Sequence, residues 1–137
     1  MTERLLLDTD VIIHLLKKHP ETVKRFIELS ERGTIFLLSP IVIAEIYAGA
    51  FKHEHPQIET FFSLCQPLTL DGEVARMTGN YANRYRKAFQ GISLEDYFLA
   101  ATARQQRCPL WTGNRKHYPM DDIDLFPTQP QSQEKPF

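Results

Sequence analysis

Short apolar runs alternate along the chain with longer segments in which apolar positions recur three and four residues apart. A short continuous apolar run is typical of a strand buried on both faces of a parallel sheet, and the second pattern is typical of a helix. Strands are predicted at 5–7, 34–38, 67–70, 109–112 and, as an edge strand, 123–126. Helices are predicted at 10–18, 20–32, 41–51, within 52–64, at 71–89 and at 94–106.

The alternation of strands and helices predicts an α/β fold with a mostly parallel sheet. Local signals support the helix starts, because Ser39 and Ser93 suit N-caps and Pro40 suits a first helical turn. The last residues of the chain are polar, contain proline and show no periodicity. We therefore predict one domain over residues 1–126 and a flexible tail over 127–137.

The composition is that of an ordinary globular protein, with 42% hydrophobic and 24% charged residues in a chain of 137. Cys65 and Cys108 lie far apart without metal-ligand spacing, so two buried free thiols in a reducing compartment are expected. The N-terminus lacks the pattern of a signal peptide, and no apolar run approaches the ~20 residues of a membrane span. These features predict a cytoplasmic protein without membrane contact.

The charge is unevenly distributed, although the net charge of −1 argues against bulk binding of polyanions. Residues 76–116 contain eight basic and two acidic residues, an excess of six positive charges. Such a stretch can form a phosphate-facing surface, and solvated helix faces explain each basic residue equally well when it is taken singly. The candidate phosphate contacts are Arg84, Arg86, Arg115 and Lys116.

Polar groups stand at the ends of the predicted strands or in the helical turns beside them. They are Asp8 after the first strand, Glu45 one turn into the helix after the second, Asp96 in the first turn of the helix before the fourth, and Asn114 after the fourth. The carboxyl ends of parallel strands share one edge of the sheet, which is where open α/β sheets bind their ligands. We therefore expect these side chains to converge.

Converging carboxylates repel one another and raise one another's pKa. A hard divalent cation removes that conflict, and Mg²⁺ or Mn²⁺ fits better than zinc because the chain shows no His/Cys ligand set. Such an ion polarises a phosphoryl oxygen and generates hydroxide for in-line attack on a phosphodiester. The pattern therefore predicts metal-dependent phosphodiester hydrolysis.

Each acid also has a purely structural explanation. Asp10 is interpreted chiefly as the N-cap of the helix that it begins, with a supporting role beside Asp8 as the alternative. Asp96 can form a capping box with Ser93, and Glu45 alone can be an exposed helix residue. A structural interpretation of Asp8 leaves a charge at the end of a buried strand, so the prediction of a site rests on the joint pattern.

Three stretches resemble the PIN domain and, within it, the toxin ribonucleases of type II toxin–antitoxin modules, the VapC group: LLLDTDVII, SPIVIAEIYAG and ISLEDYFLAATARQQRCPLWTGNRKHYP. The resemblance covers about residues 4–126 and implies a three-layer α/β/α sandwich around a parallel sheet of four to five strands. It implies an endoribonuclease that uses Mg²⁺ or Mn²⁺ and leaves a 5′-phosphate and a 3′-hydroxyl. By the same resemblance, Asp8, Glu45 and Asp96 are the catalytic acids that bind the metal.

Other positions of the motifs are carried over in the same way. Thr9 matches the small polar residue after the first acid, and Thr112 and Asn114 match a Thr-x-Asp/Asn motif after the fourth strand. Asn114, the fourth catalytic candidate, is neutral where many relatives have Asp, so the acids complete only a first metal site. His117 stands where some relatives have an acid, and Asp10 takes a position often held by Asn or Ser.

The resemblance also implies partners. Relatives act on RNA, usually form homodimers, and are held inactive by an antitoxin whose tail covers the acidic pocket. Ile58, Phe61 and Phe62 are candidates for the apolar surface that receives the antitoxin, and plain core packing is the alternative for each of them.

Two other functions compete with the nuclease. A strand followed by Asp-x-Asp resembles the motif of haloacid-dehalogenase-type phosphatases, with Asp8 as nucleophile and Asp10 as acid/base, but the downstream Gly-Asp-x-x-x-Asp motif is missing. An inactive RNA- or protein-binding PIN-like domain is the non-enzymatic alternative, and the neutral Asn114 favours it. Neither the RNA target nor the choice between a toxin and a housekeeping nuclease follows from the chain.

Overall fold

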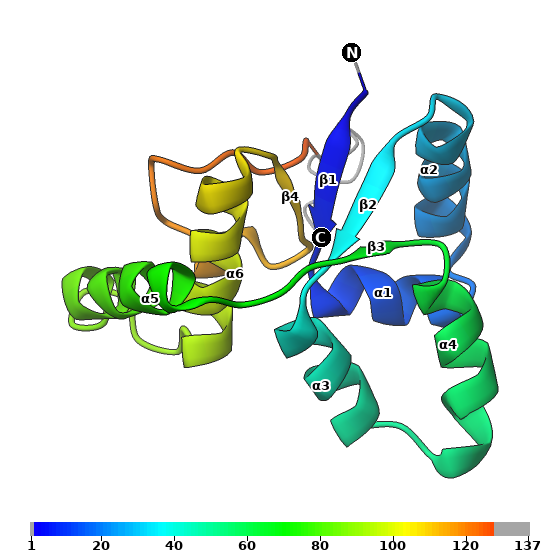
Figure 1. The fold of residues 1–137 in the computed structure, drawn as a ribbon, viewed down its shortest axis with the longest axis horizontal. Helices are drawn as coiled ribbons and strands as arrows, with labels where there is room; N and C mark the ends of the chain where they lie inside the picture. Colours follow the sequence, from blue (N-terminus) through cyan, green and yellow to red (C-terminus); the bar gives the residue numbers. More distant parts are fainter. Residues whose placement is uncertain (1, 128–137) are drawn as a thin grey trace, which may run out of the picture.

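The computed structural model describes residues 2–127, in which short strands alternate with helices (Figure 1). The strands are β1 (Arg4–Leu7), β2 (Ile35–Leu38), β3 (Gln66–Pro67) and β4 (Leu110–Trp111). The helices are α1 (Thr9–Leu16), α2 (Pro20–Glu31), α3 (Pro40–Ala48), α4 (His55–Phe62), α5 (Gly72–Tyr85) and α6 (Leu94–Gln106), with 3₁₀ helices η1 (Lys52–Glu54) and η2 (Arg115–His117).

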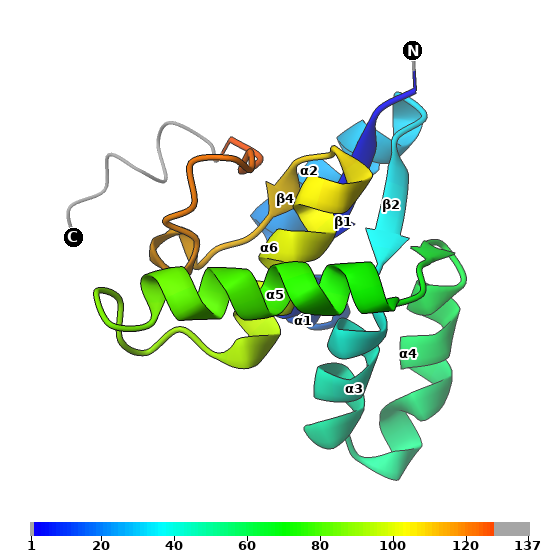
Figure 2. The ribbon, with the colours of Figure 1, turned by 60° about the vertical axis from the view of Figure 1, so that its left-hand side comes forward.

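The four strands form one sheet in the order β3-β2-β1-β4, and every pair is parallel. Helices α5 and α6 lie on one side of this sheet and α2 on the other, as Figures 1 and 2 show from two directions. This is the three-layer α/β/α sandwich implied by the resemblance, so the predicted fold class is confirmed. Because β1 is central and parallel to both neighbours, the residues that follow β1, β2 and β4 meet at one edge.

The core explains why β1 takes the central position. Leu5, Leu6 and Leu7 are all buried, as a strand covered on both faces requires. Helix α6 contributes Ala100 and Ala101, whose small side chains are also buried. Each fully buried leucine contributes on the order of 1.5–3 kcal/mol, so the strand that carries Asp8 at its end is anchored firmly.

Several helix starts match the local signals in the sequence. Ser39 is the N-cap of α3 and accepts a hydrogen bond from the N–H of Ile41, with Pro40 in the first turn. Ser93 caps α6 in a reciprocal capping box with Asp96. The cap of α1 differs from the prediction. The helix begins at Thr9 with Asp8 as its N-cap, so the interpretation of Asp10 as the cap is wrong.

Several predicted elements are shorter in the structure: the strands predicted at 67–70 and 109–112 are the two-residue strands β3 and β4, and the helix predicted to reach residue 51 ends at Ala48. The helix predicted to reach residue 89 ends at Tyr85, because the residues from 86 to 90 are exposed and no packing holds further turns. The edge strand predicted at 123–126 is reduced to one parallel bridge between Leu110 and Leu125. Its pairing partner β4 spans only two residues, which leaves no longer ladder to extend.

The tail predicted at 127–137 lies almost wholly outside the described residues, so the division at 126 stays a prediction. Among residues 2–127, no helix has both the length and the apolar character needed to cross a membrane.

Candidate active site

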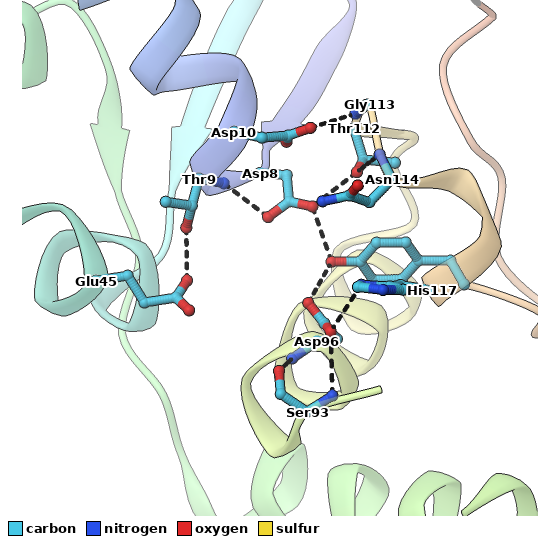
Figure 3. Close-up of polar contacts among 11 residues, drawn as sticks. Asp8, Thr9, Asp10, Glu45, Ser93, Asp96, Thr112, Gly113, Asn114 and His117 are labelled. Carbon is cyan, nitrogen blue, oxygen red and sulfur yellow. Dashed lines mark hydrogen bonds and ion pairs between the residues drawn. The ribbon is translucent and has the colours of Figure 1, made fainter. Parts of the chain in front are cut away.

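Asp8 is the centre of the site and is only 5% exposed. Its Oδ1 accepts a hydrogen bond of 2.7 Å from the N–H of Thr9, which begins α1. Its Oδ2 accepts one of 2.7 Å from the hydroxyl of Thr112, just after β4 (Figure 3). The same Oδ2 accepts a third, of 2.9 Å, from the hydroxyl of Tyr118. The end of β1 and the loop after β4 therefore position Asp8 together.

Asp96 reaches the same place from the first turn of α6 (Figure 3). Its Oδ2 accepts the N–H of Ser93 at 3.1 Å and lies 3.2 Å from Nδ1 of His117. Its Oδ1 contacts the Tyr118 hydroxyl at 3.3 Å, so one hydroxyl touches both Asp8 and Asp96. Asp96 therefore forms the capping box with Ser93 and also takes part in the site, because the capping box orients its carboxylate toward Asp8.

Glu45 approaches from α3, where Figure 3 shows its carboxylate turned toward Asp8. Its Oε1 accepts a hydrogen bond of 2.5 Å from the hydroxyl of Thr9. Thr9 thus links the first and second acids, since its N–H binds Asp8 and its hydroxyl binds Glu45. The structure brings the three predicted acids to one edge of the sheet, from three different elements.

Asp10 points away from Asp8 and holds the loop after β4 (Figure 3). Its Oδ2 accepts the N–H of Gly113 at 2.8 Å, and its Oδ1 accepts the N–H of Val11 at 2.9 Å. A Cβ on Gly113 would lie 2.5 Å from Asp10 Oδ2, so any larger residue there must displace the Asp10 carboxylate. This geometry does not favour Asp10 as the acid/base partner of a nucleophilic Asp8.

The motif after β4 supports Asp8 through Thr112. The N–H of Asn114 donates to Thr112 Oγ1 at 3.0 Å, while the Thr112 hydroxyl donates to Asp8. Asn114 lies beside Thr112 at the same edge in Figure 3. The contact that Asn114 makes to Thr112 uses its backbone, so the amide side chain remains available to a ligand.

The predicted basic residues divide into two groups. Arg115 and Lys116 belong to η2, directly before His117, which contacts Asp96. Arg84 and Arg86 lie at the C-terminal end of α5, and the guanidinium of Arg84 stands 5.9 Å from the ring centre of Tyr85. Only Arg115 and Lys116 are connected to the acids, because His117 in the same 3₁₀ helix contacts Asp96.

The acids form an electrostatically strained group. Burial is the main cause that raises the pKa of Asp8, and the charge of Asp96 adds to it against the hydrogen bonds from Thr112 and Tyr118. Burial followed by the charge of Asp8 raises the pKa of Asp10. Burial also raises the pKa of Glu45, and the charges of Asp8 and Asp96 contribute. A bound cation would relieve this repulsion.

The donor set fits a hard, water-rich cation. Asp8 and Asp96 offer carboxylate oxygens on either side of one oxygen position, and Mg²⁺ commonly binds through one or two carboxylates with water completing its shell. Among residues 2–127, no three His, Cys, Asp or Glu side chains cluster closely enough to enclose an ion by themselves. Carboxylate oxygens in this arrangement suit a hard divalent cation that keeps bound water better than they suit a closed zinc site.

Tyr118 is the site residue that the sequence analysis missed. It comes from the irregular segment after η2, where neither spacing nor periodicity marks a functional position. A tyrosine close behind the motif at 112–114 was the only available signal, since a buried tyrosine hydroxyl usually finds a partner.

The apolar candidates for partner binding also need correction. Ile58 and Phe62 are buried in the core and Phe61 packs against that core, so plain packing explains all three. Ile58 lies at the wall of a groove of about 210 Å³ that also contacts Ile13, Leu16 and Glu45. Helices α1, α3 and α4 form this groove.

Comparison with known proteins gives consistent matches. The model of the PIN domain matches residues 5–123. Ribonuclease VapC19 of Mycobacterium tuberculosis is 34% identical over 115 residues, covering 84% of this chain and 92% of the relative. Ribonuclease VapC2 of Haemophilus influenzae is 30% identical over 121 residues, covering 84% and 89%. The crystal structure of VapBC2 from Rickettsia felis aligns with a TM-score of 0.77 at 22% identity, covering 90% of this chain and 97% of that one.

Proposed function

Because the chain belongs to the PIN domain family and, within it, to the VapC ribonucleases, we propose that it is a divalent-metal-dependent endoribonuclease. The observation that carries this proposal is the convergence of Asp8 and Asp96 on one oxygen position. Two buried or half-buried carboxylates that share a position are costly unless a cation joins them. Glu45 completes the acidic group from α3.

A Mg²⁺ or Mn²⁺ ion held by Asp8 and Asp96, with Glu45 beside it, would polarise a phosphoryl oxygen and lower the pKa of an attacking water. The chain's own residues set the geometry. Thr112 and the N–H of Thr9 fix Asp8, and Ser93 and His117 fix Asp96.

Glu45 has the freedom to handle the proton of that water. Its Oε1 is occupied by Thr9, and its Oε2 makes no hydrogen bond within residues 2–127. Burial raises the pKa of Glu45 above that of an ordinary glutamate, which brings it closer to the range useful for a general base. We assign Glu45 Oε2 this role.

RNA phosphates would be bound mainly through η2. Arg115 and Lys116 precede His117, whose ring contacts Asp96, and the guanidinium of Arg115 donates to the carbonyl of Phe126 at 3.1 Å. Arg84 and Arg86 extend the basic surface from α5. Because phosphate contacts release counterions, RNA affinity should fall as salt rises, and charge reversal at Arg115 should reduce that slope more than charge reversal at Arg84.

We also propose a protein partner. The structural neighbours include VapBC complexes, in which the toxin is paired with an antitoxin. The groove of α1, α3 and α4 combines the apolar side chains of Ile13, Leu16 and Ile58 with Glu45, one of the acids. An antitoxin segment in this groove would cover the site from the side of Glu45, and a homodimer of the toxin would carry two such grooves.

The nuclease proposal is tested on the purified chain with RNA in Mg²⁺ or Mn²⁺ and in a chelator. We expect cleavage with either ion, none in the chelator, and a loss of more than about a hundredfold in Asp8→Asn and in Asp96→Asn. Asp124→Asn is the matched control, because Asp124 is exposed and lies outside the acidic group. Full activity in either site variant, or cleavage that persists in the chelator, would exclude the proposal.

A further inference from the structure

The Tyr118 hydroxyl occupies the point where the two central acids meet. It lies 2.9 Å from Asp8 Oδ2 and 3.3 Å from Asp96 Oδ1, and the residue is 4% exposed. A phenol has one proton, so it donates to one of these carboxylates at a time while it remains in contact with the other. The hydroxyl thus lies between two negatively charged groups, where a small cation would also reduce their repulsion.

The remaining carboxylate oxygens at this point are already in use. Asp8 Oδ1 is bound by the N–H of Thr9, and Asp96 Oδ2 is bound by the N–H of Ser93 and lies next to His117. The two oxygens that face each other across the site are the ones that Tyr118 contacts. A cation that joins Asp8 to Asp96 through these facing oxygens meets the Tyr118 hydroxyl, and the Thr112 hydroxyl also binds Asp8 Oδ2.

The Tyr118 hydroxyl and a hydrated cation would compete for the same place between Asp8 and Asp96. Magnesium binds oxygen at 2.0–2.1 Å in an octahedron, so neighbouring ligand oxygens lie about 3 Å apart. The phenol oxygen stands at about that spacing from both carboxylate oxygens, so it occupies the place that a water ligand of such an ion would need. Burial of Tyr118 among Asp8, Asp96 and the core leaves it little room to share.

On the basis of the proposed metal dependence, we propose that the Tyr118 hydroxyl is a placeholder for the cation. The hydroxyl holds Asp8 and Asp96 in position when the ion is absent, and the ion binds by displacing it. Tyr118 is then a positioning residue that lowers the affinity for the ion, because ion binding breaks its hydrogen bonds to charged acceptors.

The direct test measures Mn²⁺ binding by calorimetry to the wild-type chain and to Tyr118→Phe. The variant should bind Mn²⁺ about tenfold more tightly, since the hydrogen bond to a carboxylate no longer competes. Its thermal midpoint should also rise more on addition of the same Mn²⁺ concentration.

Tyr81→Phe is the matched control. Tyr81 is 3% exposed, and its hydroxyl donates to Oδ1 of the exposed Asp122 at 2.7 Å, so the same atom is removed from a buried tyrosine that binds an aspartate outside the site. This control should bind Mn²⁺ with wild-type affinity.

A second measurement needs no substitution at Tyr118. In the wild-type chain labelled with ¹³C at the tyrosine Cζ, one of the five tyrosine signals should shift as Mg²⁺ is added, and the signal that disappears in Tyr81→Phe should not. A titration in which no tyrosine signal moves, although calorimetry detects binding, overturns the placeholder.

The outcomes separate this inference from the nuclease proposal. Equal or weaker Mn²⁺ binding by Tyr118→Phe, with tight binding by the wild type, overturns the placeholder and leaves the metal site intact. Absence of Mn²⁺ binding in the folded wild-type chain overturns the metal dependence, and the placeholder with it.

Discussion

The starts of α1 and α5 place the same residue type in the same local role with opposite electrostatic results. Asp8 is the N-cap of α1 and Asp71 is the N-cap of α5, and each accepts a backbone N–H of its helix. The hydrogen bond from the N–H of Val74 is the main cause that lowers the pKa of Asp71, which is exposed. Burial raises the pKa of Asp8 instead, and the charge of Asp96 adds to it.

The difference shows what turns a helix cap into a candidate catalytic group. A capping carboxylate in water is stabilised by the helix and serves the fold. A capping carboxylate that is buried beside another acid is held in a state that a cation can relieve. The surroundings of the cap, and not the cap itself, decide between the two.

The largest predicted effect is the stability that a bound metal ion adds, which should depend on Asp8 and not on Asp71. At a Mg²⁺ or Mn²⁺ concentration of about 100 times the dissociation constant, the wild-type chain should gain about 2.7 kcal/mol of stability. Asp71→Asn should gain as much, because Asp71 is remote from the ion. Asp8→Asn should gain almost nothing. Chemical denaturation with and without the ion measures all three, and equal gains in the two variants would contradict the contrast.

A smaller effect follows from the contact between Gly113 and Asp10. In Gly113→Ala the added Cβ would lie 2.5 Å from Asp10 Oδ2, so the Asp10 carboxylate must turn away and lose its hydrogen bond to the N–H of residue 113, at a cost of about 1–3 kcal/mol. Gly79→Ala is the control, because Gly79 lies within α5 with nothing within 4 Å of the added Cβ. The free energy of unfolding of Gly79→Ala should rise by roughly 0.5–1 kcal/mol. Urea denaturation decides, and a neutral Gly113→Ala would show that Asp10 does not fix the loop.

The hydroxyl of Thr112 should contribute about a factor of ten to the affinity for Mn²⁺. Thr112→Val removes the 2.7 Å hydrogen bond to Asp8 while it keeps the shape of the side chain, and we expect Mn²⁺ affinity to fall about tenfold. Thr78→Val removes a buried hydroxyl of α5 that donates to the carbonyl of Val74, and it should leave Mn²⁺ binding unchanged. Equal affinities by calorimetry in wild type and Thr112→Val would remove Thr112 from the site.

The smallest effect is the pH dependence of stability in a chelator. The raised pKa values of Asp8, Asp10 and Glu45 mean that the folded chain holds protons more tightly than the unfolded one, so stability should fall as pH rises from the usual values of 3.8 and 4.5 through the raised ones. Asp71 has the opposite sign, and its contribution is lost as pH falls below 3.8.

Two variants separate these pH contributions. Asp8→Asn should flatten the fall at higher pH, and Asp71→Asn should flatten the loss in acid. Thermal midpoints measured from pH 3 to pH 8 test both. If Asp8→Asn flattened the loss in acid and Asp71→Asn the fall at higher pH, burial would not be the cause that raises the pKa of Asp8.

The sequence predicted the fold class and the meeting of the acids for one physical reason. Parallel strands end at a common edge, so an acid after β1 and a threonine after β4 had to be neighbours once the apolar runs were recognised. The capping signals at Ser39 and Ser93 were equally local and were confirmed.

Local sequence patterns did not predict the geometry that depends on distant parts of the chain. Asp10 looked like a cap, but α1 starts one residue earlier, and its carboxylate turns to Gly113. Tyr118 reaches Asp8 through an irregular segment that no periodicity describes. The strand expected at 123–126 needs a longer β4 to pair with, and only Leu125 forms a bridge.

The partners of Asp8 also set the time at which the site can exist during synthesis. Thr112 and Tyr118 follow Asp8 by 104 and 110 residues, and β4 follows the central strand β1 by a similar length. At about 5–20 residues per second, the ribosome makes Asp8 roughly 5 to 20 s before Tyr118. A nascent chain therefore carries its first acid without the partners that orient it, and the completed site arises only when translation of the domain is nearly finished.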